Sequence, residues 1–326
     1  MSNVELIIQN GTKAYLPVVE DTIEWTTERK GVPGKLTFKI LNDGAITIEE
    51  GNAVRFKYDN KNVFFGFLFE KKTDKSKEVS LTCYDQLRYL KNKDTYVYSN
   101  KTAKAFIKMV ADDFGLRCGN LIETSWTIAN RIEENKTLFD MFQNALDITL
   151  QNTGELFVLY DDFGKLTLDH IQNMRIPLLI DEDTSEDYDY TSSIDNEVYN
   201  QIKLTYDNEN TGKREVYIVK DSNHINDWGI LQYFESIDEN TNGKSKANAL
   251  LSLYNQKTKS LKIKNVLGDV RVRGGSSVVV RLTLMDIKIE SFMIVEKVKH
   301  TFTNNLHLMD LELKGGVFNG WYEWTY

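Results

Sequence analysis

The stretch KLTFKI, residues 35–40, alternates apolar with polar side chains, and residues 54–58 (VRFKY) and 78–84 (EVSLTCY) repeat that alternation. A period of two over five or more residues predicts β-strands with one buried face. Residues 63–69 (VFFGFLF) are almost wholly apolar, which is typical of a strand buried on both faces. Turn signals separate these strands at residues 31–34, 42–44 and 59–60. The short spacing predicts a small antiparallel barrel or sandwich.

The hydrophobic period changes to about 3.6 in the middle of the chain, between residues 93 and 180. An apolar stripe follows Thr102, which we expect to cap a helix that ends at Gly115. Thr137 predicts the start of a second helix and Gly154 its end. Residues 155–160 and 165–170 then predict a hairpin around the turn DDFG, and the region is a mixed helix and strand insert.

Strands return towards the end of the chain. The segment 181–190 (DEDTSEDYDY) carries six carboxylates in ten positions and predicts a solvated linker. Residues 201–206 and 214–219 flank a turn rich in asparagine and predict a hairpin, and one helix is expected at about 244–258. Further strands are predicted at residues 261–266, 277–284, 292–301 and 307–313.

These patterns predict a β-rich α+β fold with two antiparallel β-barrel domains around a mixed helix and strand insert. The predicted divisions are a first β-barrel at residues 1–92, an α/β insert at 93–180, and a second β-barrel at 181–326 that holds the helix at about 244–258.

Composition excludes several classes of function. The chain has 326 residues, a net charge of −8 and a pI near 5.3, which disfavours sequence-specific binding to nucleic acid. Two cysteines, Cys83 and Cys118, belong to no metal-binding spacing. The first residues show no signal peptide and no apolar run could span a membrane, so we expect a protein made and kept in a cytoplasm, without membrane insertion.

No catalytic or cofactor-binding motif is present, so no catalytic residue, cofactor or metal is assigned and the chain is not expected to be an enzyme. His300 and His307 lie on adjacent predicted strands and could face each other across a hairpin, but a metal or nucleophile site would need a third group. Asp161 and Asp162 are neighbours in a turn, where side chains point apart, so they do not form a hydrolytic carboxylate pair.

Two acidic segments are candidate cation sites. Residues Asp238 to Gly243 match the first half of a calcium loop, but its twelfth position is Ala249, so a polar turn that caps the following helix is favoured. The acids of 181–190 could gather a weak cation, although such a run is usually a solvated segment.

Three stretches resemble one known family. The first is PGKLTF at 33–38, followed by GNAV at 51–54 and FFG at 64–66; the second is CYDQLRYLKNK at 83–93; the third starts with GGSSVVV at 274–280 and continues through VKH at 298–300 to HLMDL at 307–311. In order and spacing the chain resembles the baseplate hub proteins of contractile phage tails, in PBSX-like prophages and tail-like bacteriocins (the late control gene D-like tail hub family).

This resemblance implies a structural protein of a virion or phage-tail-like particle. It implies a homotrimeric ring in which two tube-like β-barrels per chain adapt a sixfold tail tube to a threefold central spike. The implied partners are further copies of the chain, the spike, the tube and other baseplate proteins, with the tape-measure protein as a further candidate. An alternative is a cell-wall carbohydrate-binding or peptidoglycan-degrading tail module.

The last six residues, WYEWTY, contain four aromatic side chains: Trp321, Tyr322, Trp324 and Tyr326. Chain ends fray unless they are held, and aromatic residues are enriched where proteins bind each other. These four residues are therefore candidates for binding a neighbour or partner, and packing against their own barrel is the alternative.

Overall fold

The structure is a computed structural model of the whole chain. It describes residues 3–315 apart from 42–43, 45, 74, 76, 183, 185–186, 196, 209–211, 238–240, 285–286 and 304–305.

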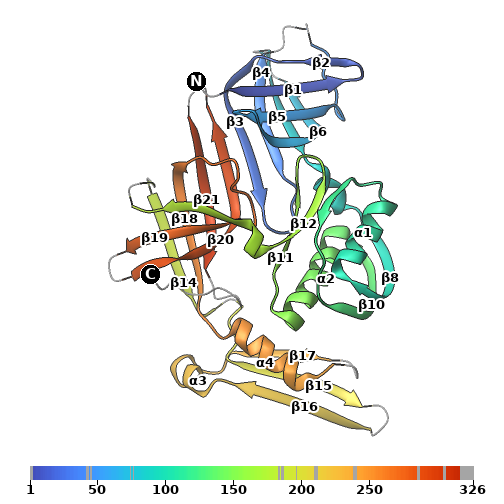
Figure 1. Ribbon diagram of the computed structural model, residues 1–326, viewed down its shortest axis with the longest axis vertical. Coiled ribbons are helices and arrows are strands. Elements are labelled where there is room, and N and C mark those ends of the chain that lie inside the picture. The colour runs from blue at the N-terminus through green and yellow to red at the C-terminus, as the bar shows by residue number, and fades with distance from the viewer. Residues whose placement is uncertain are drawn as a thin grey trace.

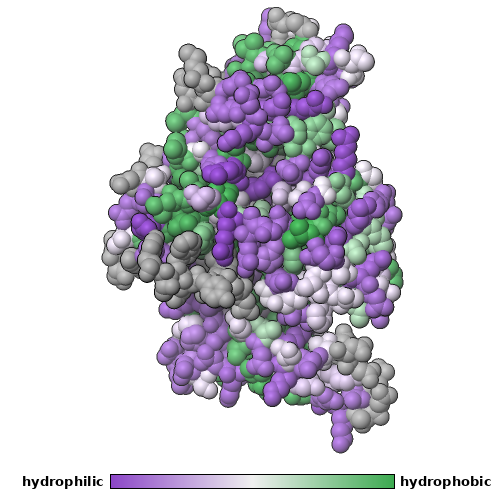
Figure 2. All heavy atoms as spheres, in the orientation of Figure 1, coloured by the Kyte–Doolittle hydropathy of each residue, from purple (hydrophilic) through white to green (hydrophobic). Residues whose placement is uncertain are grey.

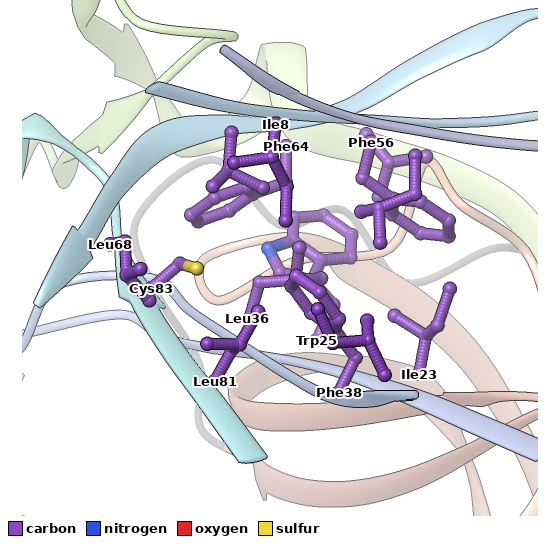
Figure 3. Close-up of a cluster of buried hydrophobic side chains, with 14 of the residues drawn as sticks. Ile8, Ile23, Trp25, Leu36, Phe38, Phe56, Phe64, Leu68, Leu81 and Cys83 are labelled. Atoms are coloured by element: carbon purple, nitrogen blue, oxygen red, sulfur yellow. The ribbon is translucent and has the colours of Figure 1, made fainter. Parts of the chain in front are cut away.

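The first part of the chain, the N-terminal β module, is a set of antiparallel strands around one core. Its strands are β1 (Val4–Asn10), β2 (Lys13–Tyr15), β3 (Val19–Glu28), β4 (Lys35–Leu41), β5 (Ala53–Tyr58), β6 (Lys61–Thr73) and β7 (Glu78–Tyr84). The order of paired strands is β3-β4-β7-β6-β5-β1-β2. Figure 3 shows side chains from this module pointing towards one another, Ile8 and Phe56 facing Trp25 and Phe38. The alternation at residues 35–40 therefore has the predicted effect, because Leu36, Phe38 and Ile40 are buried.

The insert follows a short 3-10 helix, η1 (Gln86–Lys91). Its elements are β8 (Lys93–Thr102), α1 (Ala103–Asp113), β9 (Cys118–Leu121), β10 (Thr127–Thr137), α2 (Leu138–Thr153), β11 (Phe157–Asp161), β12 (Leu166–His170) and η2 (Ile171–Met174). The predicted helix ends are confirmed. The hydroxyls of Thr102 and Thr137 accept from the backbone N–H of Ala105 and Asp140, and Gly154 ends α2 in the left-handed conformation with φ 74°.

The C-terminal β module contains β13 (Arg175–Ile180), β14 (Asp187–Ser193), β18 (Thr258–Leu267), β19 (Ser277–Leu284), β20 (Ile287–Phe302) and β21 (His307–Gly315). The predicted linker at 181–190 is wrong in its second half, because residues 187–190 lie in β14, which pairs antiparallel with β18. The reason is the alternation of aspartate with tyrosine: Tyr190 packs against the core of the module while the acids face away. Strand β13 pairs in parallel with β19.

A fourth unit, the α4 module, lies at the bottom of Figure 1. It contains β15 (Gln201–Asn208), β16 (Lys213–Lys220), α3 (Ser222–Trp228), β17 (Gln232–Ser236) and α4 (Gly243–Tyr254). The predicted hairpin of β15 and β16 is confirmed, and α4 covers the sheet with Ala247 and Leu250. The predicted helix at 244–258 ends earlier, because residues from Thr258 onwards start β18.

One pair of strands joins the two β modules. Strand β20 pairs antiparallel with β3, so that a single sheet of thirteen strands runs through both. Among the described residues the strand pairs form an open path rather than a closed ring. The β-rich, mostly antiparallel fold is thus confirmed, while closed barrels and the exact domain limits stay predictions.

None of the helices in the described ranges is long and apolar enough to cross a membrane. Figure 2 shows hydrophilic residues spread over the visible face, with hydrophobic ones in small groups between them.

Candidate functional site

The three sequence stretches that carry the family resemblance meet at one junction of the fold. Gly34 comes from the first stretch, Asp85 from the second, and Gly274 from the third. The backbone N–H of Gly34 donates to Asp85 Oδ2 at 2.9 Å, and the N–H of Gly274 donates to the hydroxyl of Thr27 on β3 at 2.9 Å. Segments that are up to 247 residues apart are therefore tied together by buried hydrogen bonds.

Asp85 is the centre of this junction. Its side chain is 5% exposed, and its second oxygen accepts the N–H of Leu87 at 3.0 Å, which caps η1. Gly34 is needed at this place because a Cβ there would lie 2.4 Å from Asp85 Oδ2. Burial, and then the nearby Asp161 carboxylate, raise the pKa of Asp85 well above its usual value.

Asp161 brings a second buried carboxyl group to the junction from the end of β11. Its Oδ1 accepts the N–H of Gly164 at 2.7 Å, while Oδ2 is buried without a hydrogen-bond partner among the described residues. Burial raises the pKa of Asp161 to about 6. Asp162 is exposed, so the two neighbours do point apart as predicted.

Arg273 supplies positive charge from the loop before β19. Its guanidinium donates to the backbone oxygen of Asp161 at 2.8 Å and lies over the ring of Tyr160, 4.3 Å from the centroid. The two following glycines allow this approach. A Cβ on Gly274 would lie 2.3 Å from the backbone of Glu28, and one on Gly275 would lie 2.5 Å from Val158. The loop thus contacts both the N-terminal β module and the insert.

The seam between β3 and β20 holds a buried histidine pair beside this junction. His300 and His307 face each other as predicted, with Nδ1 of His300 2.9 Å from Nε2 of His307. Nε2 of His300 lies 2.9 Å from the oxygen of Val272, which can only accept, so Nε2 carries the proton and Nδ1 accepts from His307. His300 also stacks on Trp25 with ring centroids 4.7 Å apart. Burial lowers the pKa of His300 to about 3 and that of His307 to about 4.

This arrangement is suited to holding modules together. The Asp85 carboxyl, the histidines and Thr27 are buried, and their hydrogen bonds are made with backbone groups or with each other. In the part of the chain that the structure describes, no three His, Cys, Asp or Glu side chains are placed to hold a metal ion.

Most of the other predicted site residues lie outside the described residues, and one predicted helix cap lies within them. Trp321, Tyr322, Trp324 and Tyr326 lie outside the described residues, and so do positions 238–240 of the segment from Asp238 to Gly243. The helix-capping interpretation of that segment is confirmed at its end, because Asn242 Oδ1 accepts the N–H of Ser245 at the start of α4. Sequence reasoning missed Arg273 and Asp161 as junction residues, although the paired glycines after Arg273 signalled a close backbone approach.

Comparisons with known proteins agree with this fold. YqbQ and the phage-like element PBSX protein XkdQ, both of Bacillus subtilis (strain 168), are each 27% identical to the chain over 320 residues, which covers 95% of this chain and 96% of theirs. The 43 kDa tail protein of prophage MuSo2 from Shewanella oneidensis superposes with a TM-score of 0.67 at 12% identity, over 95% of this chain and 98% of that one. The similarity to XkdQ confirms the resemblance to PBSX-like prophage proteins. The family model described as YQBQ-like matches residues 23–314, and the chain therefore belongs to the YQBQ-like family.

Proposed function

We propose that this protein is a structural component of a phage tail or phage-tail-like particle. The full-length similarity to XkdQ, a protein of a phage-like element, and to a prophage tail protein supports this role. The buried polar groups of the junction fix modules relative to one another, which a subunit of a large protein particle requires. We propose no catalytic activity, and the protein reaches the particle by assembly after synthesis in the bacterial cytoplasm.

Within such a particle we propose the position of a baseplate hub. The observation that carries this proposal is the pairing of β3 with β20, which joins two β modules in one chain. Three chains that each supply two tube-like modules would present six modules to a sixfold tail tube and three equivalent faces to a central spike. The other proposed partners are further baseplate proteins and the tape-measure protein.

A ring of this kind requires a head-to-tail interface that closes after three copies, because a head-to-tail contact that does not close produces filaments. The outer face of the α4 module offers exposed apolar side chains that such an interface could use. Val216 and Ile218 on β16 and Phe234 on β17 are each about half exposed, and Lys203 on β15 lies opposite both Ile218 and Phe234 in the sheet.

Light scattering on the purified chain, alone and mixed with a candidate spike protein, tests the hub. We expect a mass of about 113 kDa, three times 37.7 kDa, in at least one of the two samples. A strict monomer of 37.7 kDa in both would contradict the ring. A peptidoglycan-release assay on the same samples checks the absence of wall-degrading activity independently.

A further inference from the structure

A cleft of about 550 Å³, here called the α2–α4 cleft, lies between the insert and the α4 module in the described part of the chain. Pockets of this volume hold small molecules. The wall on the insert side comes from the start of β10 and from the last turns of α2, and the opposite wall comes from β17 and from the first turns of α4. Ala129 on β10 and Ala249 on α4 are among the lining residues, and their small side chains leave the space between the walls open.

The lining of the α2–α4 cleft is mostly polar. Six of its nineteen residues are apolar, whereas pockets that take apolar small molecules are lined mainly by apolar side chains. The lining instead contains five carboxamide side chains: Asn130, Asn144, Gln151, Asn152 and Asn242. A carboxamide carries both donors and an acceptor, so it can bond to a hydroxyl group in either direction. The cleft is therefore suited to a ligand with several hydroxyl or amide groups.

Three of these amides form a row on one face of α2. Asn144, Gln151 and Asn152 lie seven and eight residues apart, a spacing that places side chains on the same side of a helix. Asn144 and Asn152 use their amide N–H groups within the protein, on Glu133 Oε2 at 3.2 Å and on the Ile148 carbonyl oxygen at 2.7 Å. The Oδ1 acceptors of both asparagines remain available to a ligand. From Asn144 to Asn152 the helix rises by about 12 Å, so the row can contact a ligand of more than one ring.

The charges of the cleft are balanced. Each of the four charged residues that line it has an oppositely charged partner. The pairs are Arg131 with Glu133 at 2.9 Å, Lys246 with Glu235 at 2.7 Å, and Asp147 with Lys30 at 3.5 Å. Within the described lining no charge is left unpaired, which disfavours a strongly charged ligand.

Trp126 adds an aromatic surface to this polar lining. It directly precedes β10 and is 38% exposed, and Ile148 and Ile237 add further apolar surface. An indole ring offers a flat apolar face together with an N–H that needs a polar partner. The matching ligand has a flat apolar face of its own and polar groups around its edge.

We propose that the α2–α4 cleft binds an uncharged oligosaccharide, with a pyranose ring against Trp126 and hydroxyl groups bonded to the amides of α2. A pyranose ring meets both requirements of the lining, because its C–H groups form apolar faces and its hydroxyl groups donate and accept around the edge. The saccharide is bound and not cleaved: Asp147 and Glu235, the two carboxylates of the lining, are held in ion pairs, and neither is the free acid that glycoside hydrolysis needs. This inference goes beyond the proposed structural role and does not depend on it.

Calorimetric titration of the full-length protein with cellotriose, chitotriose and maltotriose tests the site. These three uncharged trimers differ in linkage and in their acetamido groups, and we expect at least one to bind with a Kd of about 1 mM or lower. Trigalacturonate, which carries a carboxylate on every ring, should bind at least about tenfold more weakly because the cleft has no unpaired cation for it. No binding of any uncharged trimer at about 10 mM, or equal binding of trigalacturonate, would overturn the proposal.

Two tryptophan variants locate the binding. Trp126→Ala removes the aromatic surface of the cleft, and Trp228→Ala is the matched control, because Trp228 stacks on His224 in α3 and does not line the cleft. We expect Trp126→Ala to raise the Kd of the bound trimer at least about tenfold and Trp228→Ala to change it by less than about twofold. An unchanged Kd in Trp126→Ala would contradict stacking at this site.

Two asparagines separate a loss of binding from a loss of stability. Asn152 and Asn248 each donate from Nδ2 to the carbonyl oxygen four residues earlier in their helix, that of Ile148 and that of Lys244, but only Asn152 lines the cleft. Replacement by alanine therefore removes the same kind of helix hydrogen bond from both variants. We expect Asn152→Ala to raise the Kd of the trimer about fivefold, the effect of one lost hydrogen bond, and Asn248→Ala to leave it unchanged. Equal Kd values in the two variants would overturn the assignment of the site.

Discussion

At neutral pH the buried carboxyl group of Asp161, a single residue of the junction, lowers the stability of the folded protein. Its carboxyl group is 5% exposed, one of its oxygens has no hydrogen-bond partner among the described residues, and its pKa is raised to about 6. The folded protein binds this proton more tightly than the unfolded chain, so the contribution of Asp161 to stability is largest below about pH 4. That contribution is lost as the pH rises through 6.

Asp161→Asn is therefore expected to stabilise the protein at pH 7. The amide keeps an acceptor for the N–H of Gly164 and removes the buried negative charge, which should add about 1–3 kcal/mol to the free energy of unfolding. Urea unfolding at pH 7 and pH 4 measures the difference, and the gain should vanish at the lower pH. Asp162→Asn, on the exposed neighbour, is the control and should change stability by less than about 0.5 kcal/mol. A destabilising Asp161→Asn would show that the charge itself has a favourable partner.

The histidine pair has the opposite dependence on pH. His300 and His307 have pKa values of about 3 and 4, below the ordinary 6.5, so the unfolded chain binds more protons than the folded one between about pH 4 and 6.5. Their contribution to stability is complete above pH 6.5 and falls on acidification. In the wild type the two effects partly cancel. We expect the melting temperature of Asp161→Asn to fall more steeply than that of the wild type from pH 7 to pH 4, measured by differential scanning calorimetry. Parallel curves would contradict this account.

Among the elements, those with local signals were predictable and those that depend on distant partners were not. Thr137 and Gly154 mark the ends of α2 because both caps act within one helical turn. Residues 187–190 of β14 fall in the predicted linker, because the partner strand β18 lies about 70 residues later and no local signal outweighs their charges. The junction was not predictable for the same reason: the paired glycines at 274–275 indicate a close backbone approach, but not that Gly34 and Asp85 lie beside it.

The glycines of the junction give a test at this scale. Gly274→Ala would place a Cβ 2.3 Å from the backbone of Glu28, whereas Gly34→Ala would place one 2.4 Å from the side chain of Asp85. In Gly274→Ala the backbone of strand β3 must move, whereas in Gly34→Ala only the Asp85 carboxylate must move. We expect both to destabilise, Gly274→Ala by about 3 kcal/mol or more and Gly34→Ala by about 1–3 kcal/mol. Unfolding in guanidinium measures the loss of stability in each variant. A larger loss for Gly34→Ala than for Gly274→Ala would contradict the tight contact at β3.

At the scale of the whole molecule, the sheet that runs from β3 to β20 makes the two β modules one body, while the α4 module has a hydrophobic cluster of its own. The small size of that cluster and its few connections to the rest indicate a unit that opens separately.

Hydrogen exchange read by mass spectrometry in rising urea checks this division. Peptides from β15, β16 and α4 should lose protection at lower urea than peptides from β3 and β20, and the latter two should lose protection together. Simultaneous loss of protection in all peptides would show that the α4 module belongs to the same cooperative unit.

The pairing of β3 with β20 also has a consequence for synthesis. Trp25 on β3 lies opposite His300 on β20, so one of the first strands made must wait for one of the last. At bacterial rates of about 5–20 residues per second this interval lasts on the order of tens of seconds. Throughout it the free edge of β3 is a template on which another nascent chain from the same message could pair. Until translation passes residue 302, pairing of β3 with its own β20 therefore competes with pairing of β3 with a neighbouring nascent chain on the same message.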